Sequence, residues 1–234
     1  MEQITVLKTN NLMKTYQQGE NTVYAVNRLN LSFPYAKLSA IIGPSGSGKS
    51  TLLHILGGLD IPSGGEVWVR TDDEKEQNLY AMTDGELTAF RGKHFGFVYQ
   101  NYELIPVMTA MENILIPCIY GGAYFDKDWF AHLVDILELK NRLHHLPSEM
   151  SGGEQQRVAM ARDLIHRPRI LFADEPTGNL DSRHAEEVLE LLLTMREEHN
   201  QTIVMVTHDM TLAARADVVY RIRDGALDGV GIPA

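Results

Sequence analysis

Short, uninterrupted runs of apolar residues are the most regular feature of this sequence. They are rich in β-branched and aromatic residues, and they have the length of strands. Several runs do not alternate with polar residues, which predicts strands buried on both faces, as in a parallel sheet covered by helices. The clearest runs are residues 38–42, 66–69, 95–99, 170–173, 203–206 and 218–222.

Helices are predicted between these runs, where apolar residues recur on one side of a helical repeat. Ser182 is expected to cap a helix that extends to about His199, and Asp126 is expected to cap another. Two shorter helix starts have the capping-box pattern, Thr83-x-x-Glu86 and Thr109-x-x-Glu112.

Polar or glycine-rich segments follow four of the buried runs. Ligands of an open parallel sheet bind beyond the carboxyl ends of its strands. Four such ends predict one site assembled from distant parts of the sequence, which core packing does not explain. Ile42 precedes a glycine-rich turn, Tyr99 precedes Gln100, Ala173 precedes Asp174 and Glu175, and Thr207 precedes His208.

The glycine-rich turn fits the phosphate-binding pattern G-x-x-x-x-G-K-[ST] in full, between a predicted strand and a predicted helix over 51–56. Lys49 is placed to reach the β- and γ-phosphates, and the Ser50 hydroxyl is placed to bind Mg²⁺. A flexible loop would explain the glycines but not Lys49 and Ser50 at this spacing, and a dinucleotide-binding turn would need glycine instead of Thr51. The predicted nucleotide-binding residues are Gly43, Pro44, Ser45, Gly46, Ser47, Gly48, Lys49, Ser50 and Thr51.

Two carboxylates follow the run 170–173. Asp174 is expected to hold Mg²⁺, directly or through water, and Glu175 to orient or deprotonate an attacking water. The alternative is a simple turn, since Asp-Glu-Pro176 also suits one.

A second glycine pair opens the predicted helix that runs to about Ile165. Ser151-x-x-Glu154 is a capping box, but capping does not require Gly152 and Gly153, each of which weakens a helix by about 1 kcal/mol. Bare backbone there suits the approach of a phosphate. A chain that already has one phosphate loop needs a second only if another copy of the protein uses it.

Together, these segments resemble the ATP-binding cassette (ABC) ATPases over nearly the whole chain. The sequence is most similar to the lipoprotein-releasing, macrolide-efflux and cell-division branch, through residues 52–60, 95–100, 151–157 and 173–182. Met150 and Glu154 depart from the commoner leucine and glutamine. The motifs are residues 43–51 (Walker A), Gln100 (Q-loop), 150–154 (signature), 170–175 (Walker B with Glu175), 180–181 (D-loop) and His208 (switch histidine).

The resemblance implies an α/β P-loop NTPase fold with a mostly parallel core sheet, an antiparallel β-subdomain and a helical subdomain at about 101–165, within a single domain over 1–234. It implies two copies that enclose ATP and Mg²⁺. One copy would supply Tyr16 (or its rival Tyr24) for the adenine, with Gln100 and Asp174 at the metal and Glu175 and His208 in catalysis. The partner would supply the signature residues Ser151, Gly152, Gly153 and Glu154, and Asp181 would link the two sites.

The resemblance further implies that ATP hydrolysis drives membrane permease subunits, which export or extract a lipoprotein, drug, peptide or heme-like cargo. The alternative is an ATPase whose membrane partner transmits force to cell-wall enzymes without transport. The segment 101–109 is either where the membrane partner docks or internal packing. The chain is expected on the cytoplasmic face of the membrane.

Composition argues against several other kinds of site and partner. The net charge of −10 argues against nonspecific binding to nucleic acid. A single cysteine, Cys118, excludes an internal disulfide and a cysteine-clustered zinc site. The longest charge-free stretch, 113–125, contains Pro117 and is too short to span a bilayer, and the amino end lacks the apolar segment of a signal peptide.

Overall fold

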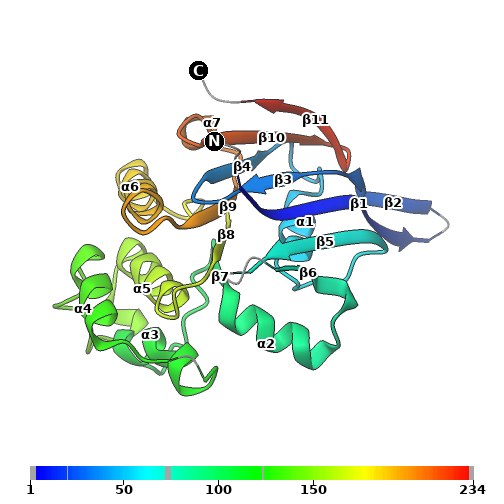
Figure 1. Cartoon of the computed structure of the whole chain (residues 1–234). Helices are drawn as coiled ribbons and strands as arrows, with labels where there is room; N and C mark the ends of the chain where they lie inside the picture. The colour runs from blue at the N-terminus through cyan, green and yellow to red at the C-terminus, as the bar shows by residue number, and fades with distance from the viewer. Residues whose placement is uncertain (1–3, 20, 72–74, 123, 232–234) are drawn as a thin grey trace.

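A central sheet with the strand order β11-β10-β4-β9-β8-β7 organises the molecule (Figure 1). The computed structural model describes residues 4–19, 21–71, 75–122 and 124–231. Neighbouring strands from β10 to β7 are parallel, and β11 is antiparallel to β10, which confirms the mostly parallel core sheet. The strands are β4 (Leu38–Ile42), β7 (Phe95–Tyr99), β8 (Ile170–Asp174), β9 (Thr202–Val206), β10 (Val218–Arg223) and β11 (Ala226–Gly231).

An antiparallel sheet lies beside the central one, with the order β2-β1-β5-β6 and β3 paired to β1. Only β5 was among the predicted runs. β1, β2 and β6 escaped prediction because much of each faces solvent or is interrupted, as in β1, whose register with β2 shifts between Leu12 and Lys14, and β3 has only three residues. The strands are β1 (Thr5–Gln18), β2 (Asn21–Leu29), β3 (Ser32–Pro34), β5 (Gly64–Arg70) and β6 (Glu76–Asn78).

The helices begin largely where the sequence predicts. Capping boxes at Thr83, Thr109 and Ser151 and the cap at Asp126 are confirmed. The cap at Ser182 was wrong: Asp181 has the extended conformation of a cap, and its Oδ1 accepts hydrogen bonds from the next helical N–H groups. The helices are α1 (Lys49–Leu56), α2 (Asp84–His94), α3 (Ala110–Ile119), α4 (Lys127–Ile136), α5 (Gly152–Leu164), α6 (Ser182–His199) and α7 (Met210–Ala213), with 3-10 turns at Leu79–Ala81 and Pro147–Glu149.

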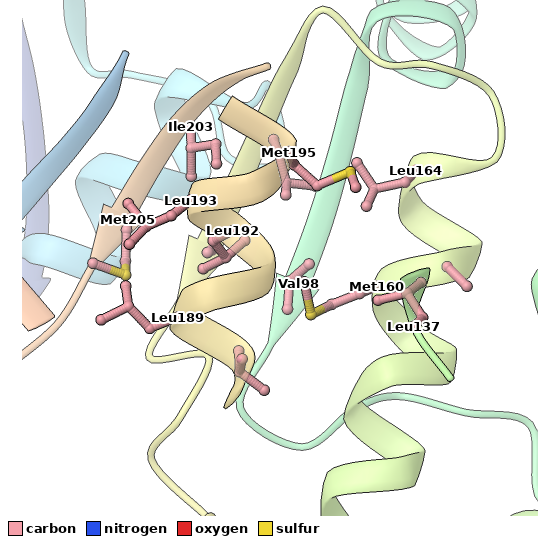
Figure 2. Close-up of a cluster of buried hydrophobic side chains, with 14 of the residues drawn as sticks. Val98, Leu137, Met160, Leu164, Leu189, Leu192, Leu193, Met195, Ile203 and Met205 are labelled. Carbon is pink, nitrogen blue, oxygen red and sulfur yellow. The ribbon is translucent and has the colours of Figure 1, made fainter. Parts of the chain in front are cut away.

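The central strands bury alternate residues in two different cores, which explains their unbroken apolar sequences. Leu171 and Ala173 face a cluster shared with α5 and α6, while Ile170 and Phe172 face a cluster shared with α1 and the antiparallel sheet. Figure 2 shows part of the first cluster, where Met160 and Leu164 of α5 lie opposite α6. Each face of the sheet is therefore fixed by its own helices.

Helices α3, α4 and α5 lie together on one side of the molecule (Figure 1). Ile114 of α3 and Leu133 of α4 belong to the same buried cluster as the central strands. The boundaries of a helical subdomain at about 101–165 therefore stay a prediction. Among the residues that the structure describes, no helix combines the length and apolar character needed to cross a membrane.

Candidate functional site

The loop between β4 and α1 needs glycine for close backbone approach. Gly48 has a φ of 95°, and a Cβ there would lie 1.8 Å from the carbonyl oxygen of Ala25 in β2. A Cβ on Gly43 would lie 2.0 Å from the carbonyl oxygen of Ile222 in β10. No larger residue fits these contacts, so both sheets fix the path of the loop.

Lys49 begins α1 and is 7% exposed. Its Nζ donates to the Pro44 carbonyl at 2.9 Å, which holds the ammonium group over the loop. An amino-terminal helix end and a held ammonium group together suit a phosphate. The lysine therefore has the position that the sequence pattern predicts.

Ser50 and Asp174 meet although they are far apart in the sequence. The Ser50 hydroxyl donates to Asp174 Oδ1 at 3.1 Å, and His54 Nε2 lies 3.8 Å from Asp174 Oδ2. Burial raises the pKa of Asp174, and the hydrogen bond from Ser50 opposes that shift. A hydroxyl beside a carboxylate is a donor set that suits Mg²⁺.

Glu175 and His208 form the adjoining pair. His208 Nδ1 lies 2.9 Å from Glu175 Oε2, within hydrogen-bond distance. Glu175 has a left-handed φ of 46°, and its N–H donates to the Val206 carbonyl of β9 at 3.0 Å. Such a backbone is costly for glutamate, so the surrounding structure holds it in place.

A cavity of about 750 Å³ joins most of these groups. This volume lies in the range of small-ligand sites. Gly43, Pro44, Ser47 and Asp174 do not line the cavity, although Asp174 contacts the cavity-lining Ser50, and Ser47 is buried. The lining residues are Val23, Tyr24, Ala25, Ser45, Gly46, Gly48, Lys49, Ser50, Thr51, Glu175, His208 and Asp224.

The cavity includes residues that the sequence did not single out. Val23 and Ala25 belong to β2, a strand that was not predicted. Asp224 follows β10 at the same edge of the sheet as the other site residues. The Asp-Gly pair 224–225, a typical hairpin turn after a predicted strand, was a usable signal for it.

The two tyrosine candidates differ in position. Tyr24 lines the cavity, whereas the Tyr16 hydroxyl donates to Asp60 Oδ2 at 2.9 Å. Tyr16 is the register partner of the cavity-lining Val23. Paired residues share a sheet face, so Tyr16 lies beside the cavity. Its side chain is 44% exposed. Burial and the hydrogen bond to Asp60 raise the pKa of Tyr16.

Gln100 lies outside the cavity lining. Its Nε2 donates to Asn179 Oδ1 at 3.1 Å, and Asn179 Nδ2 donates back to the Gln100 carbonyl at 3.0 Å. The structure therefore does not join Gln100 to Ser50 and Asp174. Asn179 was not singled out from the sequence.

The signature residues also lie outside this cavity. Ser151 Oγ accepts from Glu154 N at 3.3 Å, and Glu154 Oε2 accepts from Ser151 N at 2.7 Å. Burial favours protonated Glu154, but hydrogen bonds from Arg142 and Ser151 outweigh it and lower its pKa to about 2. Arg142 Nε donates to Glu154 Oε1 at 2.5 Å.

The two signature glycines have close neighbours in their own chain. A Cβ on Gly153 would lie 2.7 Å from His184 Cδ2, and one on Gly152 would lie 2.9 Å from the Tyr102 hydroxyl. His184 Nδ1 in turn lies 2.8 Å from Asp181 Oδ2. Internal packing is therefore a second reason for glycine here, beside the approach of a phosphate.

Comparison with known proteins gives consistent matches. The ABC transporter family matches residues 26–178. The lipoprotein-releasing system ATP-binding protein LolD of Rickettsia bellii is 44% identical over 225 residues, covering 95% of this chain and 97% of the relative. The ABC transporter ATP-binding protein MJ0796 of Methanocaldococcus jannaschii is 42% identical over 229 residues, covering 95% of each.

Solved structures agree with these matches. The dimeric post-hydrolysis structure of the ATP-binding cassette MJ0796, bound to ADP and Pi, superposes with a TM-score of 0.85. It is 38% identical in sequence, and the match covers 97% of this chain and 99% of that one.

Proposed function

This chain belongs to the ABC transporter family, and on that premise we propose how its residues divide the work of an ATP-hydrolysing transporter subunit. The phosphate loop holds the triphosphate through its backbone N–H groups and Lys49. Ser50 and Asp174, in contact at 3.1 Å, hold Mg²⁺, which neutralises phosphate charge when it is bound.

Glu175 is the proposed general base. The observation on which this assignment rests is its contact with His208 at 2.9 Å on the wall of the nucleotide cavity. Glu175 accepts a proton from the attacking water, and His208 holds the carboxylate in the direction that reaches it.

Replacing Glu175 by Gln tests this assignment. The amide keeps the shape of the side chain but cannot take a proton, so we expect ATP hydrolysis to fall about 10²–10⁴-fold. ATP affinity should stay within about two-fold of wild type, since phosphate contacts remain. Turnover of the purified chain and nucleotide titration measure the two quantities, and near-normal turnover would rule out Glu175 as the base.

We propose that two copies of the chain enclose two ATP molecules, each completed by the partner's Ser151 and Gly153. The support is that these residues lie outside the cavity of their own chain, while the related MJ0796 cassette is described as dimeric. Differential contacts in the closed pair supply the free energy that moves the membrane subunits. Asp181, next to His184 and Gly153, is the proposed link between the two sites.

The proposed docking surface for the membrane partner includes Val107, which is 84% exposed, and Ile105, which is 38% exposed. Leu104 instead packs against the buried core, so internal packing accounts for that residue. An exposed apolar side chain beside the Gln100 loop suits a partner that must sense the nucleotide site.

Lipid-anchored protein is the cargo class that the named LolD relatives favour, over a membrane partner that only transmits force. Co-purification with the membrane partner, followed by ATPase assays with lipoprotein, drug, peptide and heme, tests this proposal. A lipoprotein-specific rise in turnover supports it. A rise with another cargo, or with none, contradicts it.

A further inference from the structure

The side chain of Gln100 is held by one residue, Asn179. Gln100 Nε2 donates to Asn179 Oδ1 at 3.1 Å. Asn179 Nδ2 donates to the Gln100 carbonyl at 3.0 Å and to Asn101 Oδ1 at 2.9 Å. Both ends of one carboxamide are thus bonded to the same loop, on the outside of the nucleotide cavity.

The neighbouring glycine makes room for this arrangement. A Cβ on Gly178 would lie 2.8 Å from Gln100 Nε2 and 3.0 Å from its Cδ. The Gln100 carboxamide therefore rests on bare backbone. Gly178 N donates to the Glu175 carbonyl at 3.0 Å, so a single tight turn connects the proposed base to the residues that hold Gln100.

The loop that follows Gln100 is anchored separately. Arg162 of α5 donates to the Glu103 carbonyl at 2.6 Å and to the Tyr102 carbonyl at 3.1 Å. Tyr102 and Glu103 both have left-handed φ angles, of 59° and 48°. Because this backbone is held from the other side, losing the Asn179 contacts should release the Gln100 side chain without unfolding the loop.

We propose that Asn179 is a positioning residue that holds the Gln100 side chain through this hydrogen bond and must release it before Gln100 can act at the metal or the attacking water. This inference rests on the proposed function, since it assumes that role for Gln100. In the free subunit, the contact with Asn179 therefore limits hydrolysis.

Two variants release Gln100 in different ways. Asn179→Ala removes the hydrogen-bonding partner, whereas Gly178→Ala keeps that partner and displaces the flexible end of Gln100. We expect each to raise the turnover of the full chain, without its membrane partner, by about three- to ten-fold, the range for one or two lost hydrogen bonds. The KM for ATP should change by less than about two-fold, because neither variant alters a phosphate contact.

Gly85→Ala is the matched control, because a Cβ at Gly85 has no neighbour within 4 Å among the described residues. It should leave turnover unchanged. Thermal unfolding of all three variants separates a released side chain from a damaged fold. If folded Asn179→Ala and Gly178→Ala leave turnover unchanged or lower it, the inference is overturned.

Gln100→Ala separates this inference from the proposed function. If Gln100→Ala alone leaves hydrolysis intact, the proposed role of Gln100 is wrong, and the inference falls with it. If Gln100→Ala lowers hydrolysis, adding Asn179→Ala to it should have no further effect. If Asn179→Ala raises turnover by the same factor in the Gln100→Ala background as in wild type, Asn179 does not act through Gln100. That result would refute this inference and leave the proposed function standing.

Discussion

The phosphate-loop region and the signature region both have glycine backbone at a helix start, but only the first lines the nucleotide cavity of its own chain. In the phosphate-loop region, which comprises residues 43–51 with Asp174, Glu175 and His208, Lys49, Ser50, Glu175 and His208 line one cavity, and Asp174 contacts Ser50. In the signature region, residues 150–154, the capping groups bond to each other, and none of them lines that cavity.

This difference indicates that the two regions have separate roles in a site shared by two chains. The phosphate-loop region is built to bind nucleotide by itself, since its lysine, hydroxyl and carboxylate are held by contacts within the chain. In the signature region Ser151 is exposed, whereas Gly153 is buried in the free chain beside His184, and Arg142 bonds to Glu154. Loss of Lys49 should therefore weaken nucleotide binding by the single chain, whereas a change at Gly153 should lower hydrolysis and leave that binding intact.

Gly153→Asp is expected to have the largest effect of the variants in the signature region. A carboxylate where the partner's phosphate approaches should lower hydrolysis about 100-fold or more, as the loss of a backbone donor to an anion does. ATP affinity of the single chain should stay unchanged by nucleotide titration. Because the new side chain also meets His184, the variant is repeated with His184→Ala, and recovery of activity there would assign the effect to packing.

Lys49→Ala should change binding itself. Loss of a charge-assisted contact to phosphate is expected to weaken ATP affinity about 10- to 100-fold. Nucleotide titration of the single chain measures the change. Lys93→Ala is a control on the exposed side of α2, and equal affinities in the two variants would contradict the assignment of the phosphate loop.

Tyr16→Ala and Tyr24→Ala test which tyrosine stacks on the adenine of the bound nucleotide. Loss of a ring that stacks on the base costs about 1 kcal/mol or more, roughly a five-fold loss of affinity. Tyr16 is the expected contact, so its variant should lose affinity for ATP but not for inorganic triphosphate. A loss confined to Tyr24→Ala would transfer the role to the residue that lines the cavity.

Glu154→Gln should produce the smallest effect, a loss of stability that is present near neutral pH and disappears in acid. The folded-state pKa of about 2 lies below the ordinary value of 4.5, so ionised Glu154 stabilises the fold fully above about pH 4.5. That contribution is lost as the pH falls towards 2. Melting temperatures of wild type and Glu154→Gln should therefore converge between these pH values, and a constant difference would contradict the proposed carboxylate contacts.

The sequence anticipated the phosphate-loop region better than the surroundings of Gln100. Asp174, Glu175, His208 and the phosphate loop before Lys49 and Ser50 lie at the ends of buried strands, and parallel strands bring such ends to one edge. The core strands could be predicted equally well from the sequence, because burial on both faces removes polar residues from them.

The remaining features depend on contacts that no local pattern encodes. The strand β2, with Val23 and Ala25, alternates weakly and faces solvent along much of its length. Asn179 meets Gln100 across 79 residues of sequence, through a side-chain amide that is common in loops. Asp181 replaces Ser182 as a cap because only the backbone conformation decides between two adjacent capping residues.

A structure of the Glu175→Gln chain with ATP and Mg²⁺ would show whether two copies share each nucleotide, since slow hydrolysis keeps the triphosphate intact. We expect a pair in which the γ-phosphate held by Lys49 of one copy also contacts Ser151 and the Gly153 backbone of the other. A closed pair whose γ-phosphates touch residues of their own chain alone would contradict it.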